Sequence, residues 1–204
     1  ALGAMASGLK FYSGYPMSPA TTIMEFIAVH ADPYNIIVEQ AEDEIAAVNM
    51  VIGANYAGVR AMTATSGGGF CLMVEALSLA GMTETPAVIV VAQRPGPSTG
   101  LPTRTEQADL SFVMHAGHGD FPRAILAPGH PEQALSLVSK AFNLADTYQT
   151  PVMVLVDQHF NDALFTVDNL DLRNIGIDRG HILTGRESPL SRTYKRYALS
   201  ESGI

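Results

Sequence analysis

The feature that most constrains the fold is a regular alternation of two hydrophobic patterns along the 204 residues. Short runs rich in apolar and β-branched residues predict β-strands at residues 9–15, 34–40, 59–66, 87–93, 123–129 and 151–158. Between them, apolar residues recur at the i, i+3, i+4 spacing of helices, at residues 18–31, 41–58, 68–82, 106–117 and 130–148. This order predicts an α/β fold, with a parallel sheet of about six strands and helices on both faces.

The same alternation sets the expected domain limits. Residues 1–160 carry all of these strands and helices, whereas the periodic pattern ends at about residue 161. We therefore expect one domain at residues 1–160 and an extended connector toward a following domain at residues 161–204. The chain opens on an apolar helical segment without a capping residue, which favours a piece of a longer protein.

Composition excludes several classes of function. The formal net charge of −8 leaves the chain without the basic surface that a nucleic-acid partner requires. Cys71 is the only cysteine, so this chain alone holds no disulfide, thiolate zinc site or iron–sulfur cluster. Because Cys71 falls in an apolar helical segment, we expect it to be buried. The apolar runs are far shorter than the roughly 18 residues of a membrane helix, and we expect a cytoplasmic protein without membrane partners.

Four loops follow expected strands and should meet at one edge of the sheet. They are residues 15–18, 39–44, 65–69 and 94–110. In open parallel sheets, ligands bind outside the carboxyl ends of the strands, where the chain leads into helices. The side chains of these loops are therefore the candidates for a binding site.

The first two loops each offer one candidate side chain. Ser18 precedes Pro19, a pair typical of a helix N-cap with proline at the first helical position, although the hydroxyl could instead reach a ligand. The acidic residues 42–44 suit the positive end of the next helix. If Glu44 points inward among the apolar residues that follow it, its carboxyl would accept a hydrogen bond from a protonated ligand nitrogen.

The sequence TSGGG at residues 65–69 has two interpretations of similar weight. Consecutive glycines before a helix can expose backbone N–H groups to an anion, or they can allow a tight turn and a close backbone approach. His115 and His118 are three residues apart, but a helix that ends at Gly117 would separate them. That pattern favours no metal site.

The last loop, RPGPSTGLPTRTEQADL at residues 94–110, is the most informative. Arg94 follows a buried strand, and Thr103 and Arg104 lie about ten residues further on in a segment rich in proline. A guanidinium at a strand end with hydroxyls nearby suits a carboxylate or phosphate. These residues favour an anionic small molecule over a purely structural loop.

Together the motifs GYPMSPAT, AEDEIAAVNMVIGANYAG, TATSGGGFCLM and GPSTGLPTRTEQ, in this order and spacing, resemble the alpha subunit of 2-oxoacid:ferredoxin oxidoreductases, particularly the 2-oxoglutarate type. The resemblance covers nearly the whole chain, including TYKRYALSESGI, which is similar to the stretch that leads to a following domain. It implies the pyrimidine-binding domain of a thiamine diphosphate enzyme, whose active site forms at the interface with a beta subunit. The implied reaction is the coenzyme A-dependent oxidative decarboxylation of 2-oxoglutarate to succinyl-CoA, with electrons passed to ferredoxin.

The resemblance also implies roles for single residues. Glu44 matches the family glutamate that hydrogen-bonds the aminopyrimidine ring and thereby promotes removal of the thiazolium C2 proton. Arg94 matches the arginine that contacts the substrate carboxylate or keto group, and Thr103 matches a residue that lines the pocket for the rest of the 2-oxoacid. Ser18 stands where the family motif has threonine, and serine keeps the hydroxyl.

Further cofactor contacts are expected from Tyr15, Pro16, Thr65 and Ser66. The G-D-G motif with paired asparagines, by which the family holds diphosphate and magnesium, does not occur, nor do the cysteines for a cluster. The resemblance therefore implies that thiamine diphosphate is shared with a beta subunit, that magnesium and the iron–sulfur cluster belong to that partner, and that alpha domains contact each other as a homodimer. Two alternatives remain: action on pyruvate or a branched-chain 2-oxoacid, and a non-catalytic α/β module that binds an anion.

Overall fold

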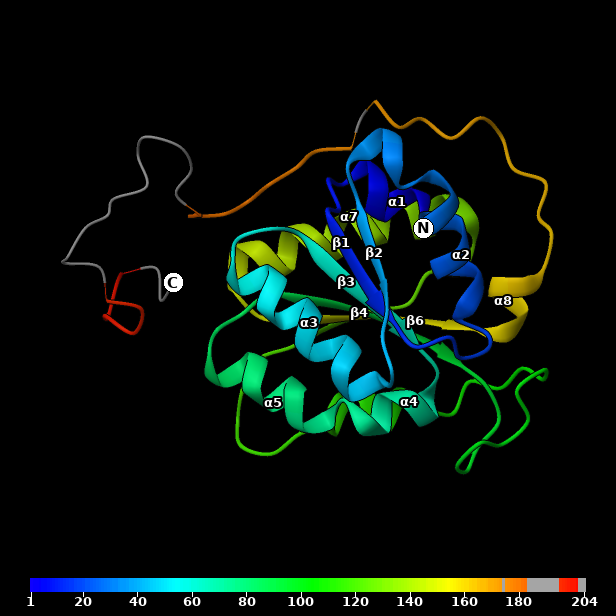
Figure 1. Cartoon of the computed structure of the whole chain (residues 1–204), viewed down its shortest axis with the longest axis horizontal. Helices are drawn as coiled ribbons and strands as arrows, with labels where there is room; N and C mark the ends of the chain where they lie inside the picture. Colours follow the sequence, from blue (N-terminus) through cyan, green and yellow to red (C-terminus); the bar gives the residue numbers. More distant parts are fainter. Residues whose placement is uncertain (174, 183–194, 202–204) are drawn as a thin grey trace.

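One parallel sheet forms the centre of the protein (Figure 1). The structure, a computed structural model, describes residues 1–173, 175–182 and 195–201. Within these residues the six strands pair in the order β2-β1-β3-β4-β6-β5, and every pairing is parallel, as expected. The strands are β1 (Phe11–Gly14), β2 (Ile37–Gln40), β3 (Ala61–Thr65), β4 (Ala87–Gln93), β5 (Ala124–Leu126) and β6 (Pro151–Asp157).

Helices cover both faces of the sheet, which confirms the expected fold class (Figure 1). Helices α1, α2 and α7 contribute to the hydrophobic core on one face, and α3, α4, α5 and α6 contribute to the core on the other. Their bounds are α1 (Leu2–Ala6), α2 (Thr21–His30), α3 (Glu44–Tyr56), α4 (Gly67–Leu72), α5 (Val74–Met82), α6 (Leu110–His115), α7 (Pro131–Tyr148) and α8 (Gln158–Asp162), with a 3-10 turn η1 (Asp32–Tyr34).

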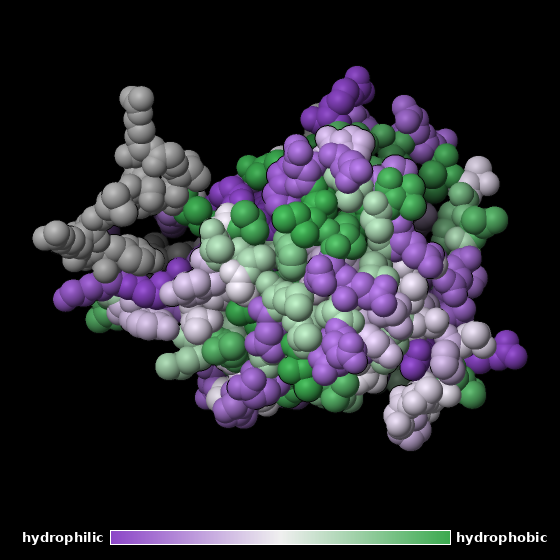
Figure 2. All heavy atoms as spheres, in the orientation of Figure 1, coloured by the Kyte–Doolittle hydropathy of each residue, from purple (hydrophilic) through white to green (hydrophobic). Residues whose placement is uncertain are grey.

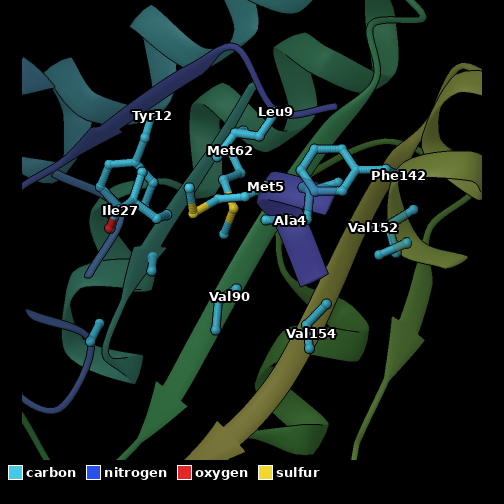
Figure 3. Packing of buried hydrophobic residues seen from close by; sticks show 14 of the residues in the cluster. Ala4, Met5, Leu9, Tyr12, Ile27, Met62, Val90, Phe142, Val152 and Val154 are labelled. Atoms are coloured by element: carbon cyan, nitrogen blue, oxygen red, sulfur yellow. The ribbon is translucent and has the colours of Figure 1, made fainter. Parts of the chain in front are cut away.

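Strand β4 shows why the sheet needs two layers of helices. Its side chains alternate between the faces, and all seven residues are buried. Val88 and Val90 join the core that contains Phe142 of α7, seen from close by in Figure 3. Ile89 and Val91 join the opposite core, beside Phe70 of α4. The continuous apolar run is therefore the pattern of a strand covered on both sides.

The amino-terminal edge of the sheet is held by a buried ionic cluster. Arg60, which precedes β3, is 1% exposed, and its Nε lies 2.8 Å from Oδ2 of Asp146 near the end of α7. The same oxygen lies 2.8 Å from Nε of Arg179. Arg60 also donates hydrogen bonds to the carbonyl oxygens of Ser7 and Asp178, each at 2.7 Å. This cluster fastens the segment around residues 178–179 to the domain.

Several sequence expectations differ from the structure in detail. The helix expected at residues 68–82 is two helices that meet at Met73, and the helix expected at residues 106–117 covers only α6. Helix α8 had no counterpart in the sequence analysis, because its five residues are too few for a periodic pattern. The boundary at residue 160 stays a prediction, and residues 174, 183–194 and 202–204 of the expected connector lie outside the described part.

Membrane insertion has no candidate element in the described part of the chain. None of its helices combines the length and the apolar character that crossing a bilayer requires.

Candidate functional site

The carboxyl ends of β1, β2, β3 and β4 bring most of the candidate residues to one edge of the sheet. Ser18 follows β1, Glu44 begins α3 after β2, Thr65 ends β3, and Arg94 follows β4. Because β1 leads into α2 on one face while β3 leads into α4 on the other, the connections diverge at this point. Such a divergence is where α/β sheets bind ligands.

Glu44 lies inward, as the sequence analysis considered. Its neighbour Asp43 is the N-cap of α3 and accepts a hydrogen bond of 2.7 Å from the backbone N–H of Ala46, which fixes the start of the helix. Glu44 is therefore the first helical residue, and it is only 2% exposed. Its Oε1 is buried and has no hydrogen-bond partner within the described residues. A buried carboxylate oxygen without a donor is costly, so the site is built for a donor that comes from a ligand.

The glycines of the TSGGG motif serve close backbone approach. A Cβ atom at Gly69 would lie 2.0 Å from Oγ1 of Thr65 and 2.5 Å from Oε1 of Glu44. A Cβ atom at Gly67 would lie 2.2 Å from Oδ2 of Asp109. Of the two interpretations of this motif, the structure supports close approach. Ser66, which is fully buried, caps α4 by accepting a 3.4 Å hydrogen bond from the N–H of Gly69.

Arg94 is buried close to Glu44. It is 8% exposed, and its Nη1 donates a hydrogen bond of 2.5 Å to the carbonyl oxygen of Ser18. Its Nε is buried and has no hydrogen-bond partner in the described part of the chain. Burial lowers the pKa of Arg94, and the negative charge of Glu44 acts in the opposite direction. The two residues therefore interact electrostatically, and each retains one buried polar atom for a ligand.

The loop after β1 corrects one expectation. Helix α2 begins at Thr21 with Ala20 as its N-cap, so Ser18 does not cap it. Ser18 is exposed in the turn before the helix, and its hydroxyl makes no hydrogen bond with the described residues. Tyr15 is 39% exposed and Pro16 is partly buried, so both line the open side of the loop.

The loop at residues 94–109 is fastened to the sheet by side chains that the sequence analysis missed. Oε1 of Gln93, the last residue of β4, accepts a hydrogen bond of 3.0 Å from the backbone N–H of Asp109. Nε2 of Gln107 donates a 2.6 Å hydrogen bond to Oδ2 of Asp157 at the end of β6. Thr103 and Arg104 are exposed on this loop, in contrast to the buried Arg94 and Glu44.

Asp109 is a further residue that the sequence analysis did not identify. Its Oδ2 is buried and has no hydrogen-bond partner among the described residues. Burial raises the pKa of Asp109, and the nearby charge of Glu106 raises it further. No sequence motif distinguishes Asp109, because the contacts that bury it come from the distant glycine turn.

The remaining candidates lie away from this edge or differ from expectation. Cys71 is exposed, so the expectation that it is buried is wrong. Helix α6 ends at His115, and Gly117 adopts a φ of 97°. The backbone N–H of His118 donates to Oγ of Ser78 at 3.0 Å. No group of three potential metal ligands occurs within the residues that the structure describes.

These features define a site with one buried hydrogen-bond acceptor and one buried hydrogen-bond donor. Glu44 presents a buried acceptor, which suits a ligand N–H group, and Arg94 presents a buried donor, which suits a ligand carboxylate or carbonyl. The site is open toward Ser18 and Tyr15, both of which are exposed. A ligand that places a protonated nitrogen beside Glu44 would satisfy the buried oxygen.

Comparison with known proteins supports one family. A family model described as pyruvate flavodoxin/ferredoxin oxidoreductase, thiamine diphosphate-binding, matches residues 2–182. The 2-oxoacid:ferredoxin oxidoreductase subunit alpha of Saccharolobus solfataricus is 45% identical over 100% of this chain and 34% of its own length. The 2-oxoglutarate synthase subunit KorA of Methanothermobacter marburgensis is 43% identical over 85% of this chain and 47% of its own length.

Solved structures agree with this result. A 2-oxoglutarate:ferredoxin oxidoreductase from Magnetococcus marinus, with 2-oxoglutarate, coenzyme A and succinyl-CoA bound, aligns with a TM-score of 0.90 and 43% identity, covering 98% of this chain and 34% of that one. Benzoylformate decarboxylase from Polynucleobacter necessarius aligns with a TM-score of 0.60 at 15% identity, covering 83% of this chain and 31% of that one, and shows the fold alone. The chain thus spans between about a third and a half of the length of these relatives.

Proposed function

The chain belongs to the thiamine diphosphate-binding family of pyruvate flavodoxin/ferredoxin oxidoreductases, and from this premise we propose that it binds the pyrimidine half of the cofactor in a 2-oxoglutarate:ferredoxin oxidoreductase. The proposed reaction is the oxidative decarboxylation of 2-oxoglutarate with coenzyme A to succinyl-CoA, with electrons passed to ferredoxin. Activity requires a beta subunit in this proposal, because the chain supplies only part of the site.

The buried, unpartnered Oε1 of Glu44 is the observation that carries the proposal. Thiamine diphosphate has an aminopyrimidine ring whose protonated nitrogen is a donor, so the group fits the acceptor that Glu44 presents. When bound, the cofactor supplies the nucleophilic carbon and accepts the electrons that decarboxylation releases. Glu44 would hold the ring by this hydrogen bond, and Tyr15, Pro16, Thr65 and Ser66 would contact it.

Arg94 supports a 2-oxoacid as the substrate. Its guanidinium retains an unpartnered, buried Nε beside the exposed Ser18, and a planar guanidinium suits a carboxylate or a keto oxygen. In this proposal Arg94 orients the carboxylate or keto group, the hydroxyl of Ser18 lies near it, and Thr103 lines the pocket for the distal part. Burial of Arg94 strengthens such a contact, since water competes less for the donor.

The outer face of α3 supports a partner subunit. After Glu44 the helix carries no charged residue, and its exposed side includes Ile45, Met50 and Gly53. In Figure 2 pale green side chains lie over much of this helix, with purple ones among them. An exposed helix face without charge suits a protein interface. We place the beta subunit on this face of α3, and in this proposal that subunit holds diphosphate, magnesium and the iron–sulfur cluster. A homodimer contact with a second alpha domain is proposed as well.

The test is co-expression of this chain with a beta subunit that carries a G-D-G motif and four cysteines. The purified complex is assayed for coenzyme A-dependent viologen reduction with 2-oxoglutarate, pyruvate and a branched-chain 2-oxoacid. We expect activity from the complex with a preference for 2-oxoglutarate, and none from either chain alone. A complex that binds thiamine diphosphate but reduces viologen with none of the three substrates would contradict the proposal and favour a non-catalytic, anion-binding module.

Pyruvate is the second candidate substrate. The matching family model names pyruvate in its description, and Thr103, the residue expected beside the distal part of the substrate, is exposed. The pocket for that part is therefore not closed by this chain. Comparing kcat/KM for 2-oxoglutarate and pyruvate in the same complex separates the two candidates.

A further inference from the structure

The turn that carries Ser18 has two carbonyl oxygens that its own hydrogen bond does not use. The backbone N–H of Ala20 donates a 2.8 Å hydrogen bond to the carbonyl oxygen of Met17, which closes the turn. Such a bond leaves the carbonyl oxygens of the two central residues, Ser18 and Pro19, for partners elsewhere. Arg94 donates to the first of them through its Nη1. What holds the second oxygen therefore helps to place the turn against Arg94.

Asn161 of α8 holds the second oxygen. Its Nδ2 lies 3.1 Å from the carbonyl oxygen of Pro19. The facing atom is the NH₂ nitrogen, because a carbonyl oxygen can only accept. Pro19 is buried and Asn161 is partly buried, so water competes less for this hydrogen bond than for one at the surface. Figure 1 shows α8 beside the blue segment between β1 and α2.

The two donors come from neighbouring strands. Strands β4 and β6 pair in parallel up to their last residues, where Gln93 lies opposite Asp157. Arg94 follows the first of these strands, and α8 begins directly after the second. Asp157 also caps α8, since its Oδ1 accepts from the backbone N–H of Phe160 at 2.7 Å. The sheet and the cap thereby fix the positions from which Arg94 and Asn161 reach consecutive carbonyls of one turn.

Helix α8 and its cap also hold the other loop of the site. Oδ2 of Asp157 accepts from Nε2 of Gln107 at 2.6 Å, and the backbone N–H of His159 donates to Oγ1 of Thr105 at 3.3 Å. Gln107 and Thr105 lie on the loop that carries Thr103. One short helix thus contacts both of the loops that the proposed function assigns to the 2-oxoacid.

We propose that Asn161 is a positioning residue for the 2-oxoacid, and that it acts on Arg94 through the turn of Ser18 and Pro19. This inference rests on the proposed function. Nη1 of Arg94 is bound to the turn, and Nε remains buried for the ligand. The direction of the guanidinium therefore depends on where the carbonyl of Ser18 lies, and the contact with Asn161 fixes that position. In this proposal Asn161 does not touch the substrate.

Loss of this contact should affect the 2-oxoacid and leave the cofactor unchanged. Glu44 is held separately, at the start of α3, by the cap that Asp43 provides. Exchange of the thiamine C2 proton depends on Glu44 in the proposed function, so it should not respond to a change in α8. KM for the 2-oxoacid should rise instead, because a turn that has lost one support aligns Arg94 less often.

Asn161→Ala in the complex with the beta subunit is the test. We expect KM for the preferred 2-oxoacid to rise about three- to tenfold, as the loss of one hydrogen bond allows, with kcat within about twofold of the wild type. KM for coenzyme A and the rate of C2 proton exchange should stay at wild-type values. A merely structural defect would lower the fraction of active enzyme, and therefore kcat, without raising KM.

Gln158→Ala is the matched control. It removes a side-chain amide from the same helix, but the hydrogen bond of that amide, 2.6 Å from Nε2 to Oδ2 of Asp162, stays within α8. This variant should keep the wild-type KM. Asn161→Asp, which keeps the shape but has no NH₂ donor, gives a second variant should Asn161→Ala fail to fold. Its KM should rise at least as much, because its carboxylate faces a carbonyl oxygen.

A second measurement needs no substrate. The full 204-residue chain is labelled with ¹⁵N, and the Nε–H signal of Arg94 is followed by NMR. Asn161→Ala should shift this signal, since the turn that holds the guanidinium has moved. Gln158→Ala should leave the signal in place.

Three results would overturn the proposal. The first is an unchanged KM in folded Asn161 variants of an active complex, and the second is a rise in KM together with slower C2 proton exchange. The third is an Arg94 signal that Asn161→Ala leaves in place or that Gln158→Ala moves equally. Each of them leaves the proposed function intact, because the wild-type complex remains active. A wild-type complex that is inactive with every 2-oxoacid would instead overturn the proposed function, and this inference with it.

Discussion

The backbone of Gly69 on α4 passes so close to the side chain of Glu44 on α3 that a Cβ atom at Gly69 would lie 2.5 Å from Oε1 of Glu44. The same atom would lie 2.0 Å from Oγ1 of Thr65, which ends β3. A side chain at this position would require the side chains of both Thr65 and Glu44 to move. The glycine therefore sets the position of the one carboxylate on which the proposed function depends.

We predict that Gly69→Ala destabilises the chain, because the added methyl displaces Glu44 or Thr65. A loss of about 1–3 kcal/mol in the free energy of unfolding is expected, as for overpacking in a core. Gly53→Ala is the matched control, since a Cβ atom there meets nothing within 4 Å on an exposed face of α3. It should stabilise the chain by about 0.5–1 kcal/mol through helix propensity. Urea unfolding measures both, and equal effects of the two changes would contradict the close approach.

For Glu44→Gln in the assembled enzyme, we predict normal folding but exchange of the thiamine C2 proton that is slower by orders of magnitude. An amide cannot hold the protonated ring nitrogen as a carboxylate does. The exchange rate in deuterated solvent is measured by quenched proton NMR. Glu42→Gln, two residues away and exposed, should exchange at the normal rate. Normal exchange in the Glu44 variant would assign the function to another acid.

Arg94→Lys should lower kcat/KM for the 2-oxoacid by at least about tenfold, or roughly 1.4 kcal/mol, although the charge is kept. In the native side chain, Nη1 of the planar guanidinium donates to the carbonyl oxygen of Ser18 and Nε is left for a ligand. Lysine has no such planar group. Steady-state kinetics of the complex measure the change. Arg104→Lys, in the same loop but exposed, should have little effect. If the two variants behave alike, charge alone is sufficient and Arg94 does not orient the substrate.

The buried carboxyl of Asp109 should make the free energy of unfolding depend on pH. Its pKa is raised in the folded state, so the unfolded chain loses its proton first as the pH increases. The cost of ionising the buried carboxyl is absent below the ordinary value of 3.8 and develops as the pH rises through the raised pKa. Asp109→Asn should therefore stabilise the chain by on the order of 1 kcal/mol at pH 7, and by less as the pH falls toward 4. Urea unfolding across this range tests it, and a gain independent of pH would show that the charge of Asp109 is not the cause.

The buried ionic cluster at the amino edge should contribute far more to stability than an exposed pair. Asp146→Asn leaves Arg60 and Arg179 without their shared carboxylate, and we expect a loss of about 3–5 kcal/mol. Asp171→Asn alters the pair with Arg173, in which the two side chains are 40% and 89% exposed, and should change stability far less, because water screens the two charges. Thermal unfolding of the two variants makes the comparison. A small effect of Asp146→Asn would mean that water compensates the two guanidinium groups.

The strands could be predicted from the sequence because each is a short apolar run between turn residues, and the order of strands and helices fixed the fold class. The inward position of Glu44 could also be predicted, because this residue precedes an apolar helix face. The exposure of Cys71 could not be predicted from the sequence. The segment around it is apolar on nearly all sides, so its periodicity does not show which face is buried.

The contacts that complete the site were also beyond prediction. Asp109 pairs with Gln93 across 16 residues and lies against Gly67 from another loop, and no local pattern encodes such a meeting. Ser18 was expected to cap α2 from its neighbour Pro19, yet the turn continues to Ala20 before the helix begins. Its carbonyl is instead held by Arg94, a tertiary contact that overrides the local preference.

The hydrogen bond between Gln93 and Asp109 joins the two ends of the loop that carries Thr103. Exposed residues between these ends that do not bind the rest of the domain, unlike Arg94 and Gln107, can therefore be exchanged during evolution without changing the strand below or the helix beyond. Gly100 is an exception, because a Cβ atom there would collide with the carbonyl oxygen of Pro95. Under the proposed function, a lineage could thus acquire a new 2-oxoacid by altering a few exposed residues on a frame that stays constant, while the roles proposed for Glu44 and Arg94 are kept.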